Sequence, residues 1–291
     1  MSVRVPLIEL KQVSKLYGGR RVLDEVSLSI EQGTATALIG RNGSGKSTLL
    51  SIIAGLIHIS SGRLTRQPDI VIGYAPESFP GLKVTPEQYL RSMGRISGLI
   101  AGELEHRIQE LLEVFYLEQF RTEVMMNFSK GMLQKINLIQ ALLVPPTLLL
   151  LDEPLSGLDI PAMDQFIALL RELKKKGTAI VYSVHEPQMI EALADQVLVL
   201  QAGKMIRNIK GTENLWVKPT TYICCTGLSS AEQMEMTGRS GFISLNIITD
   251  ARRGEGIGLT VQPDATDDFL RRVLGVGGSI ISVEPLGESG I

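Results

Sequence analysis

Apolar and polar positions along the chain follow patterns that predict a sheet covered by helices. The segment from Leu7 and the alternating run VSLSI from Val26 are typical of antiparallel edge strands. The compact apolar run TATALIG from Thr34 ends at a glycine-rich turn, and a helix should follow through KSTLLSIIAGL. Further on, strand-like and helix-like runs alternate from TLLLLDEP to QVLVLQAGK. This alternation predicts an α/β fold with a mostly parallel sheet.

Two regions depart from this alternation. From about residue 85 to about residue 143, apolar residues recur at three- and four-residue intervals, which predicts a helical insertion. Around residues 209–219 the pattern weakens, and short apolar strands and one amphipathic helix, DATDDFLRRVLG, follow. We therefore expect a first domain over residues 1–213 and a small α+β domain over residues 214–291. Regulation or dimer stabilisation is the expected role of the small domain, and passive packing is the alternative.

Composition narrows the class of protein. The 291 residues are 44% hydrophobic and 21% charged, which is enough for one large core and a second small one. Lys and Arg number 29 against 31 Asp and Glu, so no excess of positive charge favours nucleic acid as a partner. No stretch has the apolar length of a signal peptide or a spanning helix, so we expect a soluble chain. The adjacent Cys224 and Cys225 exclude a disulfide framework and fit a reducing cytoplasm.

The turn after TATALIG carries a specific motif, in which a glycine, four further residues, a second glycine, a lysine and a serine follow one another. Its strand-to-helix setting lets backbone N–H groups and the positive end of the helix converge on phosphate oxygens. Lys46 is expected to reach the terminal phosphates of a nucleotide, and Ser47 to bind Mg²⁺. The predicted phosphate-binding residues are Gly40, Arg41, Asn42, Gly43, Ser44, Gly45, Lys46, Ser47 and Thr48.

Two acids follow an apolar run of four leucines, at the end of a predicted buried strand. An open α/β sheet places its ligand chemistry at the carboxyl ends of its strands. We expect Asp152 to hold Mg²⁺ through water, and Glu153 to orient and deprotonate the attacking water. A hydrophobic strand that ends in two acids is common, so these roles depend on the phosphate loop.

The stretch FSKGM from Phe128 resembles the signature LSGGQ of ABC (ATP-binding cassette) ATPases. It keeps Ser129 and Gly131 at the second and fourth positions, whereas Lys130 and Met132 depart from the family pattern. The resemblance implies that Ser129 and the backbone of Gly131 face the ATP held by another subunit, in a head-to-tail dimer. An ordinary helix cap at Ser129 is the simpler alternative.

Further stretches resemble the same family in the same order along the chain. Residues 156–159, SGLD, resemble the family's D-loop, which crosses the dimer interface. His185 follows the strand AIVYSV in the place of the switch histidine, which implies contact with the γ-phosphate. Tyr17 matches the aromatic residue that stacks on adenine. A structural histidine and a plain edge-strand tyrosine remain the alternatives.

Glu77 departs from the family pattern. After a strand of the type IVIGYAP, the family normally has a glutamine that touches Mg²⁺ and links the site to the membrane subunit. A carboxylate is a harder metal ligand than an amide, so we expect Glu77 to serve Mg²⁺ with altered coupling. The alternative is that Glu77 has left the site.

The resemblance covers Leu7 to about Gly203 and implies a function. It implies an ATPase that uses ATP and Mg²⁺, with Lys46, Glu153 and His185 as catalytic residues. Such a subunit works as a homodimer or heterodimer beneath a separately encoded membrane permease, at the cytoplasmic side of the membrane. FSKGM resembles exporters of bacteria, so export is the expected direction, with import as the alternative. A soluble ABC protein acting on ribosomes or DNA is a third possibility, but a second cassette and long heptad coiled coils are absent from this sequence.

Overall fold

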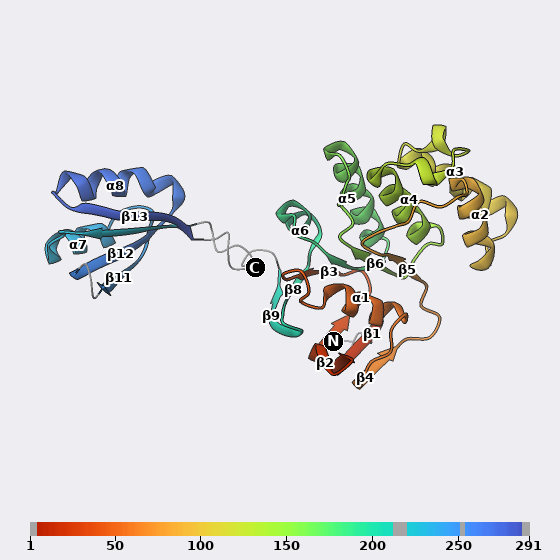
Figure 1. Cartoon of the computed structure of the whole chain (residues 1–291), viewed down its shortest axis with the longest axis horizontal. Coiled ribbons are helices and arrows are strands. Elements are labelled where there is room, and N and C mark those ends of the chain that lie inside the picture. The colour runs from red at the N-terminus through yellow and green to blue at the C-terminus, as the bar shows by residue number, and fades with distance from the viewer. Residues whose placement is uncertain (1–4, 212–219, 251–253, 287–291) are drawn as a thin grey trace. The chain divides into compact units, whose positions relative to one another are not determined.

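The computed structural model describes residues 5–211, 220–250 and 254–286. It divides the chain into two compact units, Met1–Thr212 and Glu213–Ile291 (Figure 1). The expected boundary between residues 213 and 214 lies outside the described residues. Within those residues, no helix has the length and apolar character needed to cross a membrane.

The first unit is built on a six-stranded sheet of order β5-β6-β7-β3-β8-β9. All neighbouring strands are parallel except β8 and β9, so the predicted mostly parallel α/β sheet is confirmed. Every residue of β3, β6 and β7 is buried, as expected of strands covered on both faces. The strands are β3 (Ala35–Ile39), β5 (Ile72–Ala75), β6 (Leu148–Asp152), β7 (Ala179–Ser183), β8 (Gln196–Gln201) and β9 (Lys204–Lys210).

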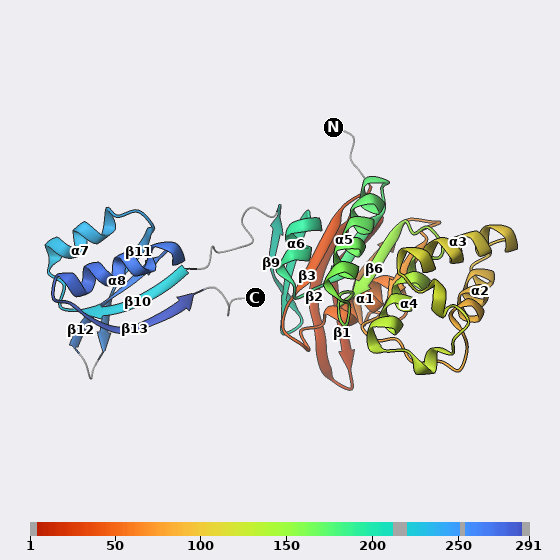
Figure 2. The same ribbon diagram turned by 90° about the horizontal axis from the view of Figure 1, so that it is seen from above.

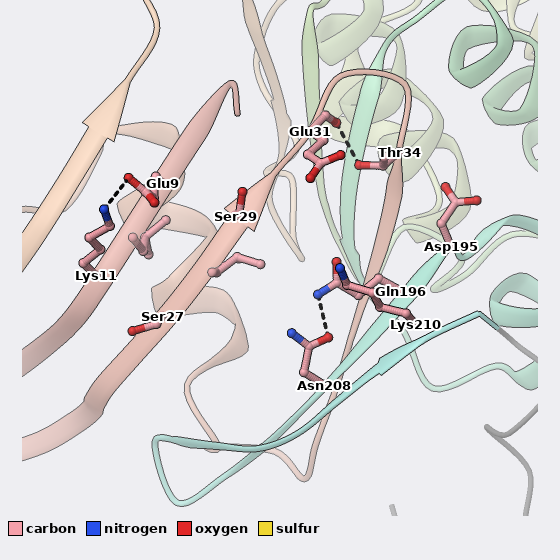
Figure 3. Close-up of a pocket in the computed structure, with 12 residues that line it drawn as sticks. Glu9, Lys11, Ser27, Ser29, Glu31, Thr34, Asp195, Gln196, Asn208 and Lys210 are labelled. Carbon is pink, nitrogen blue, oxygen red and sulfur yellow. Dashed lines mark hydrogen bonds and ion pairs between the residues drawn. The ribbon is translucent and has the colours of Figure 1, made fainter. Parts of the chain in front are cut away.

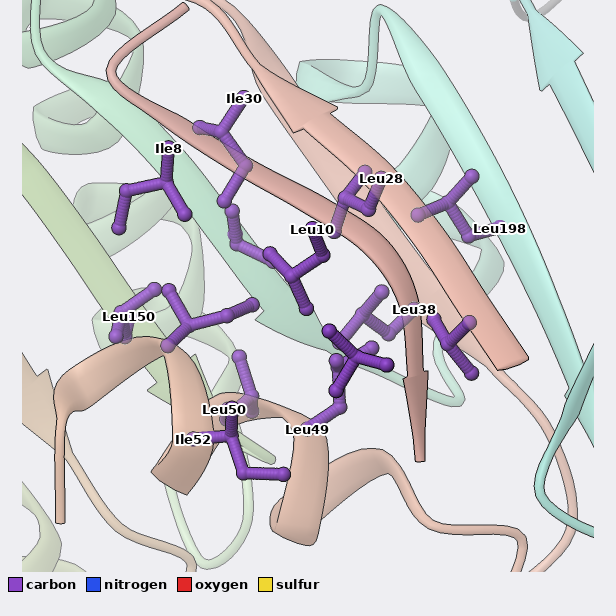
Figure 4. Close-up of a cluster of buried hydrophobic side chains, with 14 of the residues drawn as sticks. Ile8, Leu10, Leu28, Ile30, Leu38, Leu49, Leu50, Ile52, Leu150 and Leu198 are labelled. Atoms are coloured by element: carbon purple, nitrogen blue, oxygen red, sulfur yellow. The ribbon is translucent and has the colours of Figure 1, made fainter. Parts of the chain in front are cut away.

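Three further strands form an antiparallel sheet of order β2-β1-β4. They are β1 (Ile8–Tyr17), β2 (Arg20–Ile30) and β4 (Ser61–Arg66). The alternating pattern of β1 and β2 buries one face of this sheet, and α1 (Lys46–Ala54) packs between it and the six-stranded sheet. Figure 4 shows side chains from these layers in one core, including Leu10, Leu28, Leu38, Leu49 and Leu150. Strand β4 was not predicted, because nearly all its side chains are exposed and it has no apolar period.

Helices cover the remaining surfaces of the first unit. Figure 1 shows α5 (Ile160–Lys175) and α6 (Pro187–Leu193) on the side of the six-stranded sheet opposite α1. The segment between β5 and β6 is helical, and it contains α2 (Pro86–Ile96), α3 (Ala101–Val114), η1 (Glu118–Phe120), η2 (Met125–Asn127) and α4 (Lys130–Leu142). Thr85 begins this segment with a capping box, in which its side chain and that of Gln88 bond each other's backbone N–H.

The second unit follows the order β-α-β-β-α-β and forms an antiparallel sheet of order β11-β12-β10-β13. This is the split β-α-β arrangement of ferredoxin-like folds. Its elements are β10 (Thr220–Thr226), α7 (Ser230–Thr237), β11 (Phe242–Asp250), β12 (Gly254–Val261), η3 (Pro263–Ala265), α8 (Thr266–Gly275) and β13 (Ser279–Leu286). Figure 2 shows the two helices packed along the sheet, where Met236 and Phe269 join its core.

Candidate functional site

The phosphate-loop motif lies between β3 and α1, as the sequence predicts. Gly45 is the N-cap residue of α1 and has a left-handed backbone, with φ of 108°. A Cβ atom there would lie 2.7 Å from Leu23 Cδ2 and 2.9 Å from the carbonyl oxygen of Val22. Only glycine fits this position without strain, so the motif's second glycine is needed to let β2 pack close to the loop.

The loop has the features of an anion site. Lys46 is 6% exposed, and its Nζ donates a hydrogen bond to the carbonyl oxygen of Gly40 at 2.7 Å. Ser44 Oγ is buried and has no hydrogen-bond partner among the residues that the structure describes. Within the same residues, no side chain caps the N-terminus of α1. A buried cation, an unpaired hydroxyl and uncapped helix N–H groups together suit a phosphate group.

A cavity of about 250 Å³ lies against this loop. Whole small-molecule ligands occupy pockets of about 300–1,000 Å³, so the cavity suits the phosphate end of a nucleotide. It brings together eight of the predicted site residues and adds Val22, which the sequence analysis missed. The lining residues are Val22, Asn42, Gly43, Gly45, Lys46, Ser47, Thr48, Glu77 and Glu153.

A larger cavity of about 460 Å³ lies elsewhere in the first unit. Figure 3 shows it between side chains of β1 and β2, such as Glu9 and Ser27, and side chains of β8 and β9, such as Gln196 and Asn208. None of the predicted site residues lines it, and its wall contains no glycine-rich loop. Size alone therefore does not identify the functional site.

The two acids stand at the carboxyl end of β6, next to β7 and the residues that follow it. Asp152 is 2% exposed, and its Oδ1 accepts a hydrogen bond from Ser183 Oγ at 2.6 Å. Glu153 has a left-handed backbone with φ of 46°, and its N–H donates to the same Ser183 oxygen at 2.8 Å. His185 Nε2 lies 3.0 Å from Glu153 Oε1. The expected base and the expected switch histidine are therefore hydrogen-bonded neighbours.

The donor set fits a magnesium ion held mainly by a nucleotide. In the described part of the chain, no three His, Cys, Asp or Glu side chains are grouped so that they could hold a metal ion. Mg²⁺ commonly takes one or two protein oxygens and completes its shell with water and phosphate. Ser47 lines the cavity and Asp152 does not, and their roles as the protein oxygens for Mg²⁺ stay predictions. Glu77 is exposed and lines the same cavity as Ser47 and Glu153, and its metal role stays a prediction.

The residues of the FSKGM stretch lie outside this cavity, at the start of α4. Ser129 caps the helix, and its Oγ accepts from the N–H of Met132 at 3.2 Å. A Cβ atom on Gly131 would lie 2.4 Å from the carbonyl oxygen of Gly157, so this glycine lets SGLD pack directly on the helix start. Lys130 Nζ also donates to Ser156 Oγ at 3.0 Å. The two stretches are one surface of a single chain, and their contact with a second subunit stays a prediction.

Tyr17 ends β1 and is 46% exposed. The ammonium group of Lys15 lies 4.7 Å from the centre of its ring, a distance typical of a cation–π contact. Tyr17 does not line the cavity at the phosphate loop. An exposed ring on the first unit's surface is open for stacking, but its role with adenine stays a prediction.

The structure also shows buried and half-buried polar residues that the sequence analysis missed. Three amide side chains, spaced three residues apart on α4, donate hydrogen bonds to backbone carbonyls in the segments that contain Glu77 and Glu153. Gln140 donates to Tyr74 O at 2.6 Å, Asn137 to Pro76 O at 2.6 Å, and Gln134 to Pro154 O at 3.2 Å. Ser183 bonds both Asp152 and Glu153. A polar side chain inside an apolar strand or on a buried helix stripe was the available signal.

Comparison with known proteins decides the family. The family model described as ABC transporter matches residues 23–156. The zinc import ATP-binding protein ZnuC of Halorhodospira halophila is 34% identical over 204 residues, which cover 69% of this chain and 76% of that protein. This chain belongs to the ABC transporter family. It is an ATP-binding subunit, and such cassettes are ATPases.

Two further relatives of this ABC ATPase bear on its assembly and direction. The linearmycin resistance ATP-binding protein LnrL of Bacillus subtilis is 30% identical over 213 residues, covering 69% of this chain and 68% of LnrL. The cassette MJ0796, solved as a dimer in a post-hydrolysis state with ADP and Pi, is 25% identical with a TM-score of 0.64. The match covers 70% of this chain and 98% of MJ0796. Dimerisation is thus a property of this class of cassette.

Proposed function

We propose that this chain hydrolyses ATP in a head-to-tail dimer and so powers import through a separate membrane permease, bound at the cytoplasmic face. The arrangement of Glu153 carries the proposal. Glu153 lines the phosphate-loop cavity, its carboxylate is hydrogen-bonded to His185, and Asp152 directly precedes it in the chain. Phosphoryl transfer to water requires positioning and electrostatic stabilisation more than covalent chemistry, and these residues provide both.

Each residue has a distinct part in the proposed reaction. Lys46 and the N–H groups at the start of α1 bind and orient the terminal phosphates. Glu153 accepts the proton of the attacking water at a carboxylate oxygen, and His185 holds that carboxylate and the γ-phosphate in line. Ser47 and Asp152 would hold Mg²⁺ together with ATP, and the ion would neutralise charge on the phosphates.

Import is proposed in place of the expected export because of the relatives. The zinc import protein ZnuC of Halorhodospira halophila matches at 34% identity, so zinc is the first cargo to test. Export is the second candidate, because FSKGM departs from LSGGQ at Lys130 and Met132 and because a linearmycin resistance protein also matches. The permease binds the cargo in either case.

The site and the dimer are tested with Glu153→Gln in the full chain. Loss of a general base lowers reaction rates by about 10²–10⁴-fold, so the variant should hydrolyse ATP more slowly than the parent by about that factor. With Mg-ATP its mass in solution should double, and without nucleotide it should not. The control is Glu103→Gln, which changes an exposed carboxylate on α3. Parental hydrolysis that Glu153→Gln leaves unchanged would refute the assigned base.

Direction is tested after the permease has been captured by co-purification and reconstituted in vesicles with the cassettes facing outward. Zinc is loaded on one side, and ATP is added outside, where the cassettes lie. Import predicts that ATP moves zinc from the lumen to the cassette side. ATP-driven accumulation in the lumen would support the export candidate instead, and the Glu153→Gln protein should abolish either movement.

A further inference from the structure

Ser183 is the last residue of β7, and its side chain is completely buried. It pairs directly with Asp152 across the parallel β6–β7 ladder. The other residues of β7, AIVY, are buried, and their one polar side-chain atom is the Tyr182 hydroxyl, which donates a hydrogen bond to Met189 O on α6. Burying a hydroxyl costs free energy unless it is hydrogen-bonded, so a serine at the end of such a strand requires hydrogen-bond partners.

The Ser183 hydroxyl makes two hydrogen bonds, one as donor and one as acceptor. Ser183 Oγ donates a hydrogen bond to Asp152 Oδ1 at 2.6 Å and accepts one from the N–H of Glu153 at 2.8 Å. The second oxygen of Asp152 has no protein partner among the described hydrogen bonds, so it is available to a metal-bound water. One side chain therefore bonds both the metal-side carboxylate and the backbone of the base.

The backbone of Glu153 makes this contact important. A φ of 46° is uncommon for a residue other than glycine and persists only where surrounding contacts hold it. The Ser183 bond holds the N–H side of Glu153, and Gln134 Nε2 lies 3.5 Å from its carbonyl oxygen. This conformation directs the Glu153 carboxylate to His185, at 3.0 Å.

We infer that Ser183 is a positioning residue that fixes the metal-side carboxylate of Asp152 and the base Glu153 relative to each other. The inference rests on the proposed function, because it assigns Mg²⁺ to Asp152 and water activation to Glu153. Ser183 is completely buried and does not line the phosphate-loop cavity. It acts through the orientation of the two acids, in the way that outer-shell partners orient metal ligands.

The test is Ser183→Ala in the full chain, with ATPase rate measured against Mg²⁺ concentration. Loss of an outer-shell partner costs about 10–100-fold in metal affinity or activity. We expect kcat to fall by about tenfold or more and the half-saturating Mg²⁺ concentration to rise several-fold. Ser183→Cys, with similar volume and a weaker donor, should fall between the parent and the alanine variant.

The matched control is Thr178→Val. Thr178 precedes β7, is 7% exposed, and its hydroxyl donates to Pro146 O at 3.0 Å, remote from the cavity. This variant loses a buried hydroxyl bond too, so a purely structural effect should appear equally in both. Its melting temperature should drop while kcat and Mg²⁺ dependence per folded molecule stay at the parental values.

Two results would overturn the inference. One is a Ser183→Ala protein with the parental kcat and Mg²⁺ curve, and the other is the same change in Thr178→Val. If Ser183→Ala does not fold, the curve of Ser183→Cys decides, because an unchanged curve there has the same meaning. The proposed function is tested separately, by ATP hydrolysis in the parent and its loss in Glu153→Gln. That result supports the proposed function whether or not Ser183 has the positioning role.

Discussion

The sheets of the two units bury their strands in different ways. In the first unit, β3, β6 and β7 are buried on both faces, between α1 on one side and α5 and α6 on the other. In the second unit, β10 alternates, so that Ile223 and Cys225 enter the core while Tyr222 and Cys224 are only half-buried. On β13, Val283 is 42% exposed.

The two units differ in what their cores contain: the first buries polar residues of the candidate site, and the second buries an apolar cluster. The doubly covered sheet buries polar groups at its strand ends, where Asp152 and Ser183 are held by each other. The core cluster of the second unit is apolar, and charged side chains pair at its surface, as Glu235 does with Arg239 and Arg272. We therefore expect damage to the second unit to reduce stability locally and damage to the first to reduce ATP hydrolysis.

The largest expected effect is on the stability of the second unit. Phe269 is completely buried on α8, and Phe269→Ala should lower the unfolding free energy of this unit by about 3–5 kcal/mol. Calorimetry of the full chain should show one transition shifted down, with ATPase activity retained below it. Leu274→Ala on the same helix, at a residue 58% exposed, is the control. A single transition that shifts as a whole would instead show that the two units unfold together.

The next effect is on catalysis in the first unit. Lys46→Ala removes the buried ammonium at the phosphate loop. Removal of one preorganised group that stabilises charge in the transition state costs about 10²–10³-fold in rate, so ATP hydrolysis should fall by that factor. Steady-state phosphate release measures it, and Lys83→Ala, at an exposed lysine, should match the parent. A rate within twofold of the parent would remove Lys46 from the site.

A smaller effect is expected at the amides of α4. Asn137→Ala removes a completely buried amide, which leaves the part-buried carbonyl of Pro76 and the buried Gln134 Oε1 without this donor. An unsatisfied buried partner costs about 1–3 kcal/mol, which urea denaturation of the first unit should record. Asn208→Ala removes an exposed amide that bonds Gln196, and its midpoint should stay at the parental value. Equal midpoints for the two variants would contradict the role of Asn137.

The smallest effect concerns thiol chemistry in the second unit. Burial raises the pKa of the Cys225 thiol to about 11, so little of its reactive thiolate forms at pH 8. Cys224 is half-buried on the other side of the strand. Iodoacetamide at pH 8 should therefore modify Cys224 before Cys225, and peptide mass spectrometry distinguishes them. The difference should vanish in urea, and equal rates in the folded chain would contradict the burial.

Local chemistry explains which parts of the molecule the sequence predicts. The phosphate loop, the acids at the carboxyl end of β6 and the mostly parallel sheet follow from short motifs and apolar runs, and the family comparisons confirm the ATP-binding class. Helix α7 was missed because its eight residues carry little apolar periodicity, although Ser229 and Glu232 form a capping box at its start. The role of Ser183 depends on partners about 30 positions away in sequence, and no local pattern records such a contact.

The start of helix α4 has a fixed rotation about the helix axis relative to three amide side chains farther along the helix. Ser129 and Gly131 lie at its start, and Gln134, Asn137 and Gln140 anchor it to backbone beside Glu77 and Glu153. Each inserted residue would turn the start of the helix by about 100° relative to those anchors. Insertions and deletions between the helix start and the amides should therefore be excluded by selection, whereas the surface loops of the same unit can vary in length.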